Sequence, residues 1–365
     1  MKSVSLSVVV IGGGVFGCAT AFQLAKRGAR TTLIERDDFG DHASGKNPGN
    51  LNPIHGSPPE LVSFALKSLQ LHLALAAELA DLGCADYDLQ PVKRILLAFD
   101  EPERKGLEAA AKAFEGVPGL SASGLDADAI LRLDPRLSSE VVAGLLVEGN
   151  MSVNSHAFNR ALAEGAARSG ATLLRNKVIG LETADDRVIG VRTPDGTIAC
   201  DAVVLATGPW VGETRKWLGF DQPVMPVKGE MLRMRLPGEG LQYDFTRGMI
   251  SLYRRGRDEC WIGVTREHAG FDETPTEAGR LHLLEAAARI MPAVRQAVLL
   301  EHAASLRPMS PSGLPLVGRV PGWGNAYVAN GGGIKGMLLC TGVGQAISEI
   351  ILDGETRMPI NMYLS

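Results

Sequence analysis

Three glycines near the N-terminus, with an acid some distance after them, have the spacing of a dinucleotide-binding turn. Gly12, Gly14 and Gly17 fit the pattern GxGxxG, and Glu35 follows the middle glycine by about twenty positions. Glycines in this pattern allow a tight turn and let backbone N–H groups approach a pyrophosphate, while the acid accepts hydrogen bonds from the adenosine ribose. An acid there also disfavours a 2′-phosphate, so the spacing predicts a dinucleotide other than NADP. The alternative is a glycine-rich turn in an unrelated α/β protein.

The residues around this motif predict the elements that position it. The apolar run 8–11 is typical of a short buried parallel strand, and the residues after Gly14 have the period of a helix. A second strand, 31–35, ends at the acid. Free N–H groups and the positive end of the helix dipole would then meet the phosphates. Because the apolar run breaks at Gly12 and becomes helical, it does not fit a secretory signal.

A polar loop follows the second strand. Residues 41–52 read DHASGKNPGNLN and include the small polar side chains Ser44, Asn47 and Asn50. This stretch is too irregular for a helix or a strand. Its N–H groups and side chains suit a loop that wraps around a ribityl–pyrophosphate chain, and a solvent-exposed loop is the alternative.

The composition argues against several classes of function. The chain has 365 residues, with 45% hydrophobic and 5% aromatic positions and a formal net charge of −4. With no basic block and few aromatic side chains, nucleic acid is not an expected partner. The five cysteines are widely spaced, which predicts neither a disulfide framework nor a metal site. Apart from the N-terminal run, no stretch approaches about 18 apolar residues without a charge, so we expect no transmembrane segment and a cytoplasmic protein.

Further motifs carry a family resemblance over the whole chain. They are GGGVFG at 12–17 with IER at 34–36, ASGKNPGNL at 43–51, DAVVLATGPW at 201–210, SLRPMSPSGLPLVGR at 305–319 and ANGGGIKGMLLCTGVGQ at 329–345. In these stretches, and in their order, the chain resembles the flavin-dependent amine and amino-acid oxidoreductases of the D-amino-acid oxidase family. The resemblance is strongest to the glycine oxidase and sarcosine oxidase branch.

The resemblance implies an α/β fold with a second, α+β domain. In this family a Rossmann-like FAD-binding domain is interrupted by a substrate domain built on an antiparallel sheet. We therefore expect a discontinuous FAD-binding domain at 1–82, 141–222 and 302–365, and a substrate-binding domain at 83–140 and 223–301. The helical period at 155–170, followed by alternating strands with a turn at 194–196, agrees with this organisation.

The resemblance also implies which residues hold the FAD. Leu306 stands where the sarcosine oxidase branch attaches its flavin to a cysteine, so we expect noncovalent FAD. The glycines at 331–336 precede an apolar helix, whose N-terminus would face the negative charge of the reduced flavin. A strand at 176–182 would lay a backbone group of Val178 against the adenine. The expected cofactor-binding residues are Gly12, Gly14, Val15, Phe16, Gly17, Glu35, Arg36, Ser44, Gly45, Asn47, Gly49, Asn50, Leu51, Val178, Thr207, Gly208, Trp210, Gly332, Gly333, Ile334, Lys335, Gly336 and Met337.

Four residues are the candidates for chemistry on a substrate. Arg307 matches a substrate-carboxylate arginine of glycine oxidase-like enzymes, and its planar fork suits a carboxylate; a structural arginine is the alternative. Lys335 matches a lysine that sarcosine oxidase-like enzymes use for the carboxylate or the flavin edge; a solvated loop lysine is the alternative. Tyr253 lies near the place where the glycine oxidase branch has a phenol over the substrate. His55 follows the flavin loop, and both it and Tyr253 could instead be structural.

The function implied by the resemblance is oxidation of the C–N bond of a small amino acid or N-substituted glycine. Hydride would pass to flavin N5, and the imine would hydrolyse to an oxo acid plus ammonia or amine. The acceptor of the electrons stays open between oxygen and a quinone or partner subunit. The reason is that the lysine that promotes reaction with oxygen in the sarcosine oxidase branch has no clear match in ISLYRRG at 250–256.

Other possibilities remain beside this one. A flavin-binding protein without amine chemistry would share the cofactor motifs, and a homo-oligomer is compatible with the sequence. Arg94, Arg233 and Arg235 lie on expected strands of the substrate domain and could line its pocket, although arginines on sheet surfaces are common.

Overall fold

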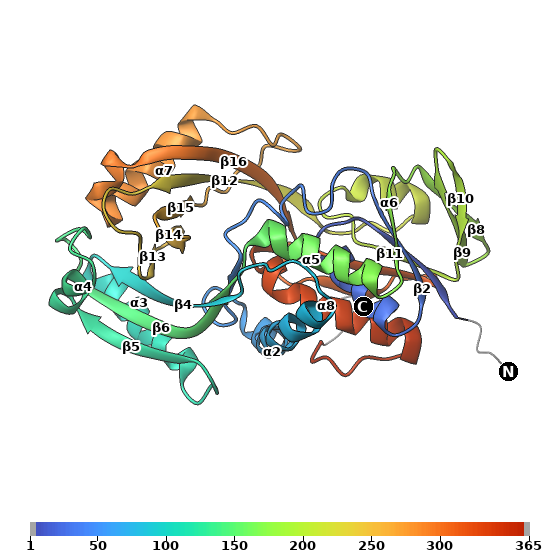
Figure 1. Ribbon diagram of the computed structural model, residues 1–365, viewed down its shortest axis with the longest axis horizontal. Coiled ribbons are helices and arrows are strands. Elements are labelled where there is room, and N and C mark those ends of the chain that lie inside the picture. Colours follow the sequence, from blue (N-terminus) through green and yellow to red (C-terminus); the bar gives the residue numbers. More distant parts are fainter. Residues whose placement is uncertain (1–4, 361–365) are drawn as a thin grey trace. The chain divides into compact units, whose positions relative to one another are not determined.

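The computed structural model describes residues 5–360 and divides into two compact units. Each unit is built from segments that are distant in the sequence (Figure 1). The first unit comprises the chain up to Leu89, Val153–Pro226 and the chain from Arg307, and the second comprises Gln90–Ser152 and Val227–Leu306. The largest difference from the expected domain limits concerns β6 (Ala143–Ser152), which we expected in the FAD-binding domain. It belongs to the second unit because it pairs with β4 (Gln90–Ala98) along its whole length.

A mainly parallel sheet forms the centre of the first unit. Its strand order is β17-β18-β11-β1-β2-β7. All neighbours pair in parallel except β17 and β18, which pair antiparallel at one edge. The apolar runs of the central strands are buried, as expected for a sheet covered on both faces. The bounds are β1 (Ser7–Ile11), β2 (Arg30–Glu35), β7 (Thr172–Arg175), β11 (Ala202–Leu205), β17 (Leu316–Arg319) and β18 (Ala326–Asn330).

The helices of the first unit pack closely because small residues stand at their crossings. α1 packs on α8 and α5, and α2 packs on α8. At Gly344 of α8 an added Cβ would lie 2.7 Å from the backbone of Ala19 in α1. At Gly165 of α5 it would lie 2.5 Å from the side chain of Leu79. The bounds are α1 (Val15–Lys26), α2 (Pro59–Asp81), α5 (Ser155–Arg168), α6 (Val211–Leu218) and α8 (Gly336–Asp353).

One helix in the described part of the chain is long and apolar enough to cross a membrane by length and composition alone. It is α8 with the turn before it, Gly333–Asp353. The expectation from the sequence considered only stretches without a charge, and this one contains Lys335 and Glu349. Within the first unit α8 lies against α1 and α2, and its residues between Met337 and Ser348 are nearly all buried.

A small antiparallel sheet follows the main sheet in the first unit. Its strands are β8 (Gly180–Ala184), β9 (Arg187–Thr193) and β10 (Gly196–Ala199), in the order β10-β9-β8. The turn between β9 and β10 stands where the sequence predicts it. The strand expected at 176–182 begins only at Gly180, so Val178 lies just before it, packed against the apolar core of this unit.

The second unit is built on a larger, mostly antiparallel sheet. Its strands follow the order β16-β12-β15-β14-β13-β4-β6, with β5 beside β6. One pair departs from the expected antiparallel sheet, because β13 and β4 run parallel. The bounds are β5 (Ser121–Asp126), β12 (Met225–Arg235), β13 (Asp244–Arg247), β14 (Ile250–Arg255), β15 (Glu259–Gly263) and β16 (Val298–Met309).

One face of this sheet carries the apolar core of the second unit. α7 (Glu277–Ile290) lies against β14 and β15 (Figure 1). Leu283 of this helix belongs to the same buried apolar cluster as Phe245 and Leu252 of the sheet. Successive side chains of a strand point to opposite faces, so the residues directly before and after Phe245 and Leu252 in the sequence stand on the other face of the sheet. The remaining helices of this unit are α3 (Glu101–Ala111) and α4 (Ala127–Leu133).

Candidate functional site

The glycine turn between β1 and α1 has no space for side chains. Gly12 has a φ of +110°, and a Cβ there would lie 2.3 Å from the carbonyl oxygen of Ala206, at the end of β11. A Cβ at Gly17 would lie 1.8 Å from the carbonyl oxygen of Gly12. These glycines are therefore required for the turn to close on the strand ends and for the helix to begin there.

The N-terminus of α1 has the character of an anion site. The helix has no acidic residue in its first turn and no side-chain cap from its N-cap residue Gly14. Val15 N–H donates to the Ser44 hydroxyl at 2.9 Å, so the loop after β2 reaches this helix end. A helix start with uncompensated positive charge favours a phosphate group.

Glu35, at the end of β2, is held next to the glycine turn. One carboxylate oxygen accepts the Gly13 N–H at 2.6 Å, and the other accepts the Asp37 N–H at 3.0 Å. Each carboxylate oxygen can accept a further hydrogen bond, and a ribose hydroxyl would be suited to that position. The structure thus places the predicted acid directly beside the predicted phosphate turn.

A small cluster next to Glu35 was not recognised from the sequence. The guanidinium of Arg36 lies 4.3 Å from the ring centre of Trp210, and the His42 ring lies 4.5 Å from it. Asp37 bonds both Arg36 and His42. The hydrogen bond from His42, with the charge of Arg36, keeps the pKa of Asp37 below its usual value. Arg36 and Trp210 are among the expected cofactor-binding residues, but the sequence did not predict their contact with each other or with His42.

The loop 41–52 is shaped by its own side chains. The Asn47 amide donates to the carbonyls of Ala43 and Ser44 and accepts the Gly49 N–H. The Ser155 hydroxyl, at the start of α5, donates to the carbonyls of Gly45 and Asn47. Asn47 therefore stabilises the loop from inside. The loop also contains a two-residue strand, β3 (Asn50–Leu51), where we expected none.

The end of β11 adds an unsatisfied hydroxyl to this region. Gly208 has a φ of +56°, and its carbonyl accepts the Asn330 amide at 2.8 Å. Thr207 Oγ1 is buried and has no hydrogen-bond partner within residues 5–360. Its backbone nitrogen is one of the atoms nearest to a Cβ placed at Gly12. A buried hydroxyl without a partner beside the phosphate turn is suited to a polar group of a bound dinucleotide.

The glycines before α8 also pack tightly. A Cβ at Gly332 would lie 2.8 Å from the ring of Phe16, and Gly333 has a φ of +52°. Gly336, the first residue of α8, has open space where a side chain would stand, and Ile334 is half exposed. Backbone at the start of α8 is therefore exposed enough for a flat ligand to approach.

Lys335 contacts the end of the loop 41–52 and the residues just after it. Lys335 is 8% exposed, and its ammonium group donates to the carbonyl oxygens of Asn52 at 2.8 Å and His55 at 2.6 Å. The structure thus joins two of the four candidate residues, through the backbone of His55. Asn52 Oδ1 is buried with no hydrogen-bond partner in the part of the chain that the structure describes. Arg307 lies on β16, half-buried, directly after the buried Leu306.

The second unit has a polar row on the sheet face opposite α7. Tyr253 on β14 is 8% exposed, and the guanidinium groups of Arg94 and Arg255 lie 5.6 and 5.7 Å from its ring centre. Arg94 pairs with the buried Asp244 at 2.9 Å. Arg233, in contrast, pairs with carboxylates of β15 and β16 and is partly exposed.

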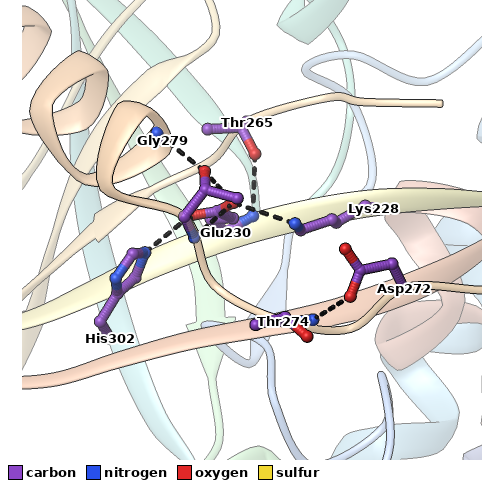
Figure 2. A network of polar contacts seen from close by, with 8 residues as sticks. Lys228, Glu230, Thr265, Asp272, Thr274, Gly279 and His302 are labelled. Atoms are coloured by element: carbon purple, nitrogen blue, oxygen red, sulfur yellow. Dashed lines mark hydrogen bonds and ion pairs between the residues drawn. The ribbon is translucent and has the colours of Figure 1, made fainter. Parts of the chain in front are cut away.

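A second polar cluster in this unit was not expected, and Figure 2 shows it centred on Glu230. The fully buried carboxylate accepts from the His302 ring at 2.7 Å and from the N–H of Thr276, the N-cap of α7, and it pairs with Lys228 at 3.3 Å. Burial by itself raises the pKa of Glu230, but these hydrogen bonds outweigh it and keep the pKa below its usual value. A Cβ at Gly279 would collide with the carboxylate. The cluster joins β12, β16 and the start of α7.

Nearly the whole chain matches one protein family. A family profile described as "FAD dependent oxidoreductase" matches residues 7–350. The chain belongs to this family. The protein is therefore an FAD-dependent amino-acid or amine oxidoreductase.

Several members are similar over nearly the full length. A glycine oxidase of Pseudomonas aeruginosa is 32% identical, with 94% of each chain covered. The crystal structure of glycine oxidase from Geobacillus kaustophilus has a TM-score of 0.91 at 29% identity and covers 97% of both chains. The crystal structure of iminodiacetate oxidase from Chelativorans sp. BNC1 has a TM-score of 0.87 at 25% identity and covers 96% of both chains. These similarities confirm the expected α/β fold with a Rossmann-like domain.

Proposed function

We propose that this FAD-dependent enzyme oxidises the C–N bond of a small amino acid or an N-substituted glycine. The substrate amine loses a hydride from Cα and a proton from nitrogen, which gives an imine. Water then cleaves the imine to an oxo acid and ammonia or an amine. The observation that carries this proposal is the similarity to glycine oxidases over nearly the full length of both chains.

The residues of the first unit fit the cofactor. The N-terminus of α1 and the Ser44 hydroxyl would hold the pyrophosphate, and Glu35 would bind the ribose. A polar group of the FAD would give the unpaired hydroxyl of Thr207 a hydrogen-bond partner. FAD, when bound, supplies the hydride acceptor at N5. The N-terminus of α8 adds its positive dipole end for negative charge on the bound cofactor.

The chain's own part in the chemistry is mainly binding and orientation. Arg307 would hold the substrate carboxylate through two parallel hydrogen bonds, because a planar fork matches a carboxylate. The ammonium group of Lys335 is fixed by hydrogen bonds to two carbonyl oxygens, and it would place a positive charge close to the start of α8. Tyr253 would contact the substrate through its phenol. His55 would contribute its carbonyl to the position of Lys335.

The FAD is held without a covalent bond in this proposal. Leu306 is 1% exposed and offers no sulfur at the position where the resemblance implies a flavin-bearing cysteine. Precipitation of the yellow protein with acid should therefore release all flavin into the supernatant. Flavin that stays with the pellet would contradict noncovalent binding.

Oxygen is the proposed electron acceptor, because the similar proteins from Pseudomonas aeruginosa and Chelativorans sp. BNC1 are named oxidases. A dehydrogenase that passes electrons to a quinone or partner subunit is the second candidate. It is favoured by one observation: β14 and the turn after it, ISLYRRG, contain no lysine. Stoichiometric hydrogen peroxide during turnover in air supports the oxidase. Flavin that stays reduced in air and is reoxidised by a quinone analogue supports the dehydrogenase.

A further inference from the structure

The carbonyl oxygen of Gly13, in the middle of the glycine turn, accepts hydrogen bonds from three donors. The backbone N–H of Gly40 donates to it at 3.2 Å, and the thiol of Cys18 donates at 3.2 Å. The side-chain amide of Asn159 donates at 3.1 Å. A carbonyl oxygen has two lone pairs, so two of these donors would already satisfy it. The third donor therefore has a purpose other than satisfying a buried acceptor.

Asn159 is the stronger of the two side-chain donors. It is fully buried on α5, in the same unit as the turn, although it is 146 positions away from Gly13 in the sequence. Burial, with the charge of Glu35, raises the pKa of the Cys18 thiol, so the thiol keeps its proton. A thiol is nevertheless a weak donor, whereas an amide N–H is a full one. The position of the Gly13 carbonyl consequently depends mainly on Asn159 and on the backbone.

The loop after β2 leaves room for the Asn159 side chain. Gly40 has a φ of +85°, and a Cβ there would lie 2.8 Å from Nδ2 and 3.0 Å from Cβ of Asn159. Only glycine fits both this conformation and this close approach. The loop, the turn and α5 therefore meet at the Asn159 amide with no other side chain between them.

The oxygen of the same amide is left unsatisfied. Asn159 Oδ1 is buried with no hydrogen-bond partner in the described range 5–360. A buried acceptor without a partner is unfavourable, and an apolar side chain of similar shape would avoid this cost. Packing alone would thus favour leucine at this position. What asparagine adds is the donor to Gly13.

A fixed Gly13 carbonyl also fixes the direction of the next N–H group. The peptide bond between Gly13 and Gly14 is trans, so the Gly14 N–H points opposite to the Gly13 carbonyl. Because the carbonyl points toward Asn159, this N–H points away from α5. Gly14 is the N-cap of α1 and the second glycine of the motif, where the backbone approaches a pyrophosphate.

We propose that Asn159 is a positioning residue for the FAD pyrophosphate. It does not contact the phosphates itself. It holds the Gly13 carbonyl, and thereby turns the Gly14 N–H into the direction in which it can bond a phosphate oxygen. A donor that is already oriented binds an anion more tightly than one that must first be turned. The proposal concerns FAD binding and is independent of which amine the enzyme oxidises.

Serial dilution of the holoenzyme, with released FAD measured by its fluorescence, tests this inference. Asn159→Leu removes the donor and the unsatisfied oxygen at nearly constant volume. Its FAD affinity should fall at least about fivefold, as for the loss of one hydrogen bond. The midpoint of thermal unfolding in excess FAD should fall by no more than about 3 °C. An FAD affinity within about twofold of the wild type would overturn the proposal.

Asn325→Leu is the matched control. Asn325 is 3% exposed and lies in the same unit, at the amino ends of β11 and β18, whereas the turn lies at the carboxyl end of β1. Its amide donates to the carbonyls of Val188 and Asp201 and accepts the Val188 N–H. This variant should lose more stability than Asn159→Leu and keep its FAD affinity. A loss of affinity in both variants that follows their loss of stability would overturn the proposal.

Phosphorus NMR gives a readout that a merely structural role would not change. With saturating FAD, the pyrophosphate signals of Asn159→Leu should move from their wild-type positions, because the Gly14 N–H has lost its fixed direction. The signals of Asn325→Leu should stay in place. Asn159→Ala, which is too small to collide with its neighbours, is measured in the same way in case the leucine variant does not fold. Wild-type signals in a folded Asn159 variant would overturn the proposal.

Discussion

The glycine turn of the first unit and the polar row of the second unit are built by different means. In the turn, Gly12 and Gly17 leave the backbone so close to neighbouring carbonyls that no side chain fits. In the row, the side chain of Arg94 bonds Asp244 and lies 5.6 Å from the ring centre of Tyr253, across adjacent strands. The turn depends on local backbone geometry, and the row depends on sheet register. The turn therefore tolerates almost no substitution, whereas the row can exchange a single side chain without a change of backbone.

The largest effect should come from filling the turn. Gly17→Ala places a Cβ 1.8 Å from the Gly12 carbonyl oxygen, so α1 or β1 must shift. We expect a loss of about 3 kcal/mol or more in stability and loss of bound flavin. Gly106→Ala in α3 is the control, since a Cβ there meets no atom within 4 Å. For both variants, the flavin content measures cofactor binding and the midpoint of thermal unfolding measures stability. A flavin-loaded Gly17→Ala protein of normal stability would refute the packing argument.

A pH-dependent effect should follow from His72, which supports the backbone at the start of α8. Its ring bonds the carbonyls of Met337 and Leu338, and burial lowers its pKa from 6.5 to about 4 despite these bonds. Between these values the unfolded chain takes up more protons, so stability should fall as the pH falls from 6.5 to 4, by up to about 3 kcal/mol.

Denaturant unfolding across this pH range measures the effect. His72→Gln should flatten the slope, because glutamine keeps a donor for the carbonyls but does not titrate. His282→Gln replaces an exposed histidine of α7 and serves as the control. An unchanged slope in His72→Gln would show that another group causes the acid sensitivity.

Arg307→Ala should affect substrate binding but not the cofactor. Removing two charge-assisted hydrogen bonds to a carboxylate should raise KM about tenfold to a hundredfold. The protein should stay yellow, because the turn is untouched. Arg319→Ala removes an exposed arginine of β17 and should leave KM unchanged. An unchanged KM in Arg307→Ala would exclude this residue as the carboxylate anchor.

The smallest effect is expected at Glu35, where a side chain assists a backbone site. Glu35→Gln keeps one acceptor for the Gly13 N–H but loses the charge. FAD affinity should fall by about 1 kcal/mol, roughly fivefold. Equilibrium titration of the apoprotein with FAD measures this, with the exposed Glu60→Gln as control. A fall in FAD affinity as large as that of a glycine variant would mean that the acid, and not the backbone, contributes most to FAD binding.

The difference between the two regions also explains what the sequence could predict. The glycine turn, Glu35 and the start of α8 are visible in the sequence because spacing along one chain segment determines their geometry. Arg94 and Asp244 are 150 positions apart and meet only through the parallel pairing of β4 with β13. The Glu230 cluster likewise needs three elements, and charged residues inside the apolar β12 are its only sequence signal. Side-chain clusters made by register therefore escaped the sequence motifs that predict the cofactor site.

The central claim is that the protein oxidises an amine next to a carboxylate with its bound FAD. Anaerobic mixing of the holoenzyme with glycine, sarcosine, D- and L-amino acids and bis-carboxymethyl amine tests it most directly. We predict that at least one of these carboxylate-bearing amines bleaches the flavin within the time of turnover, and that the matched amine without a carboxylate does not. A flavin that stays oxidised with every amine of the panel would contradict the account.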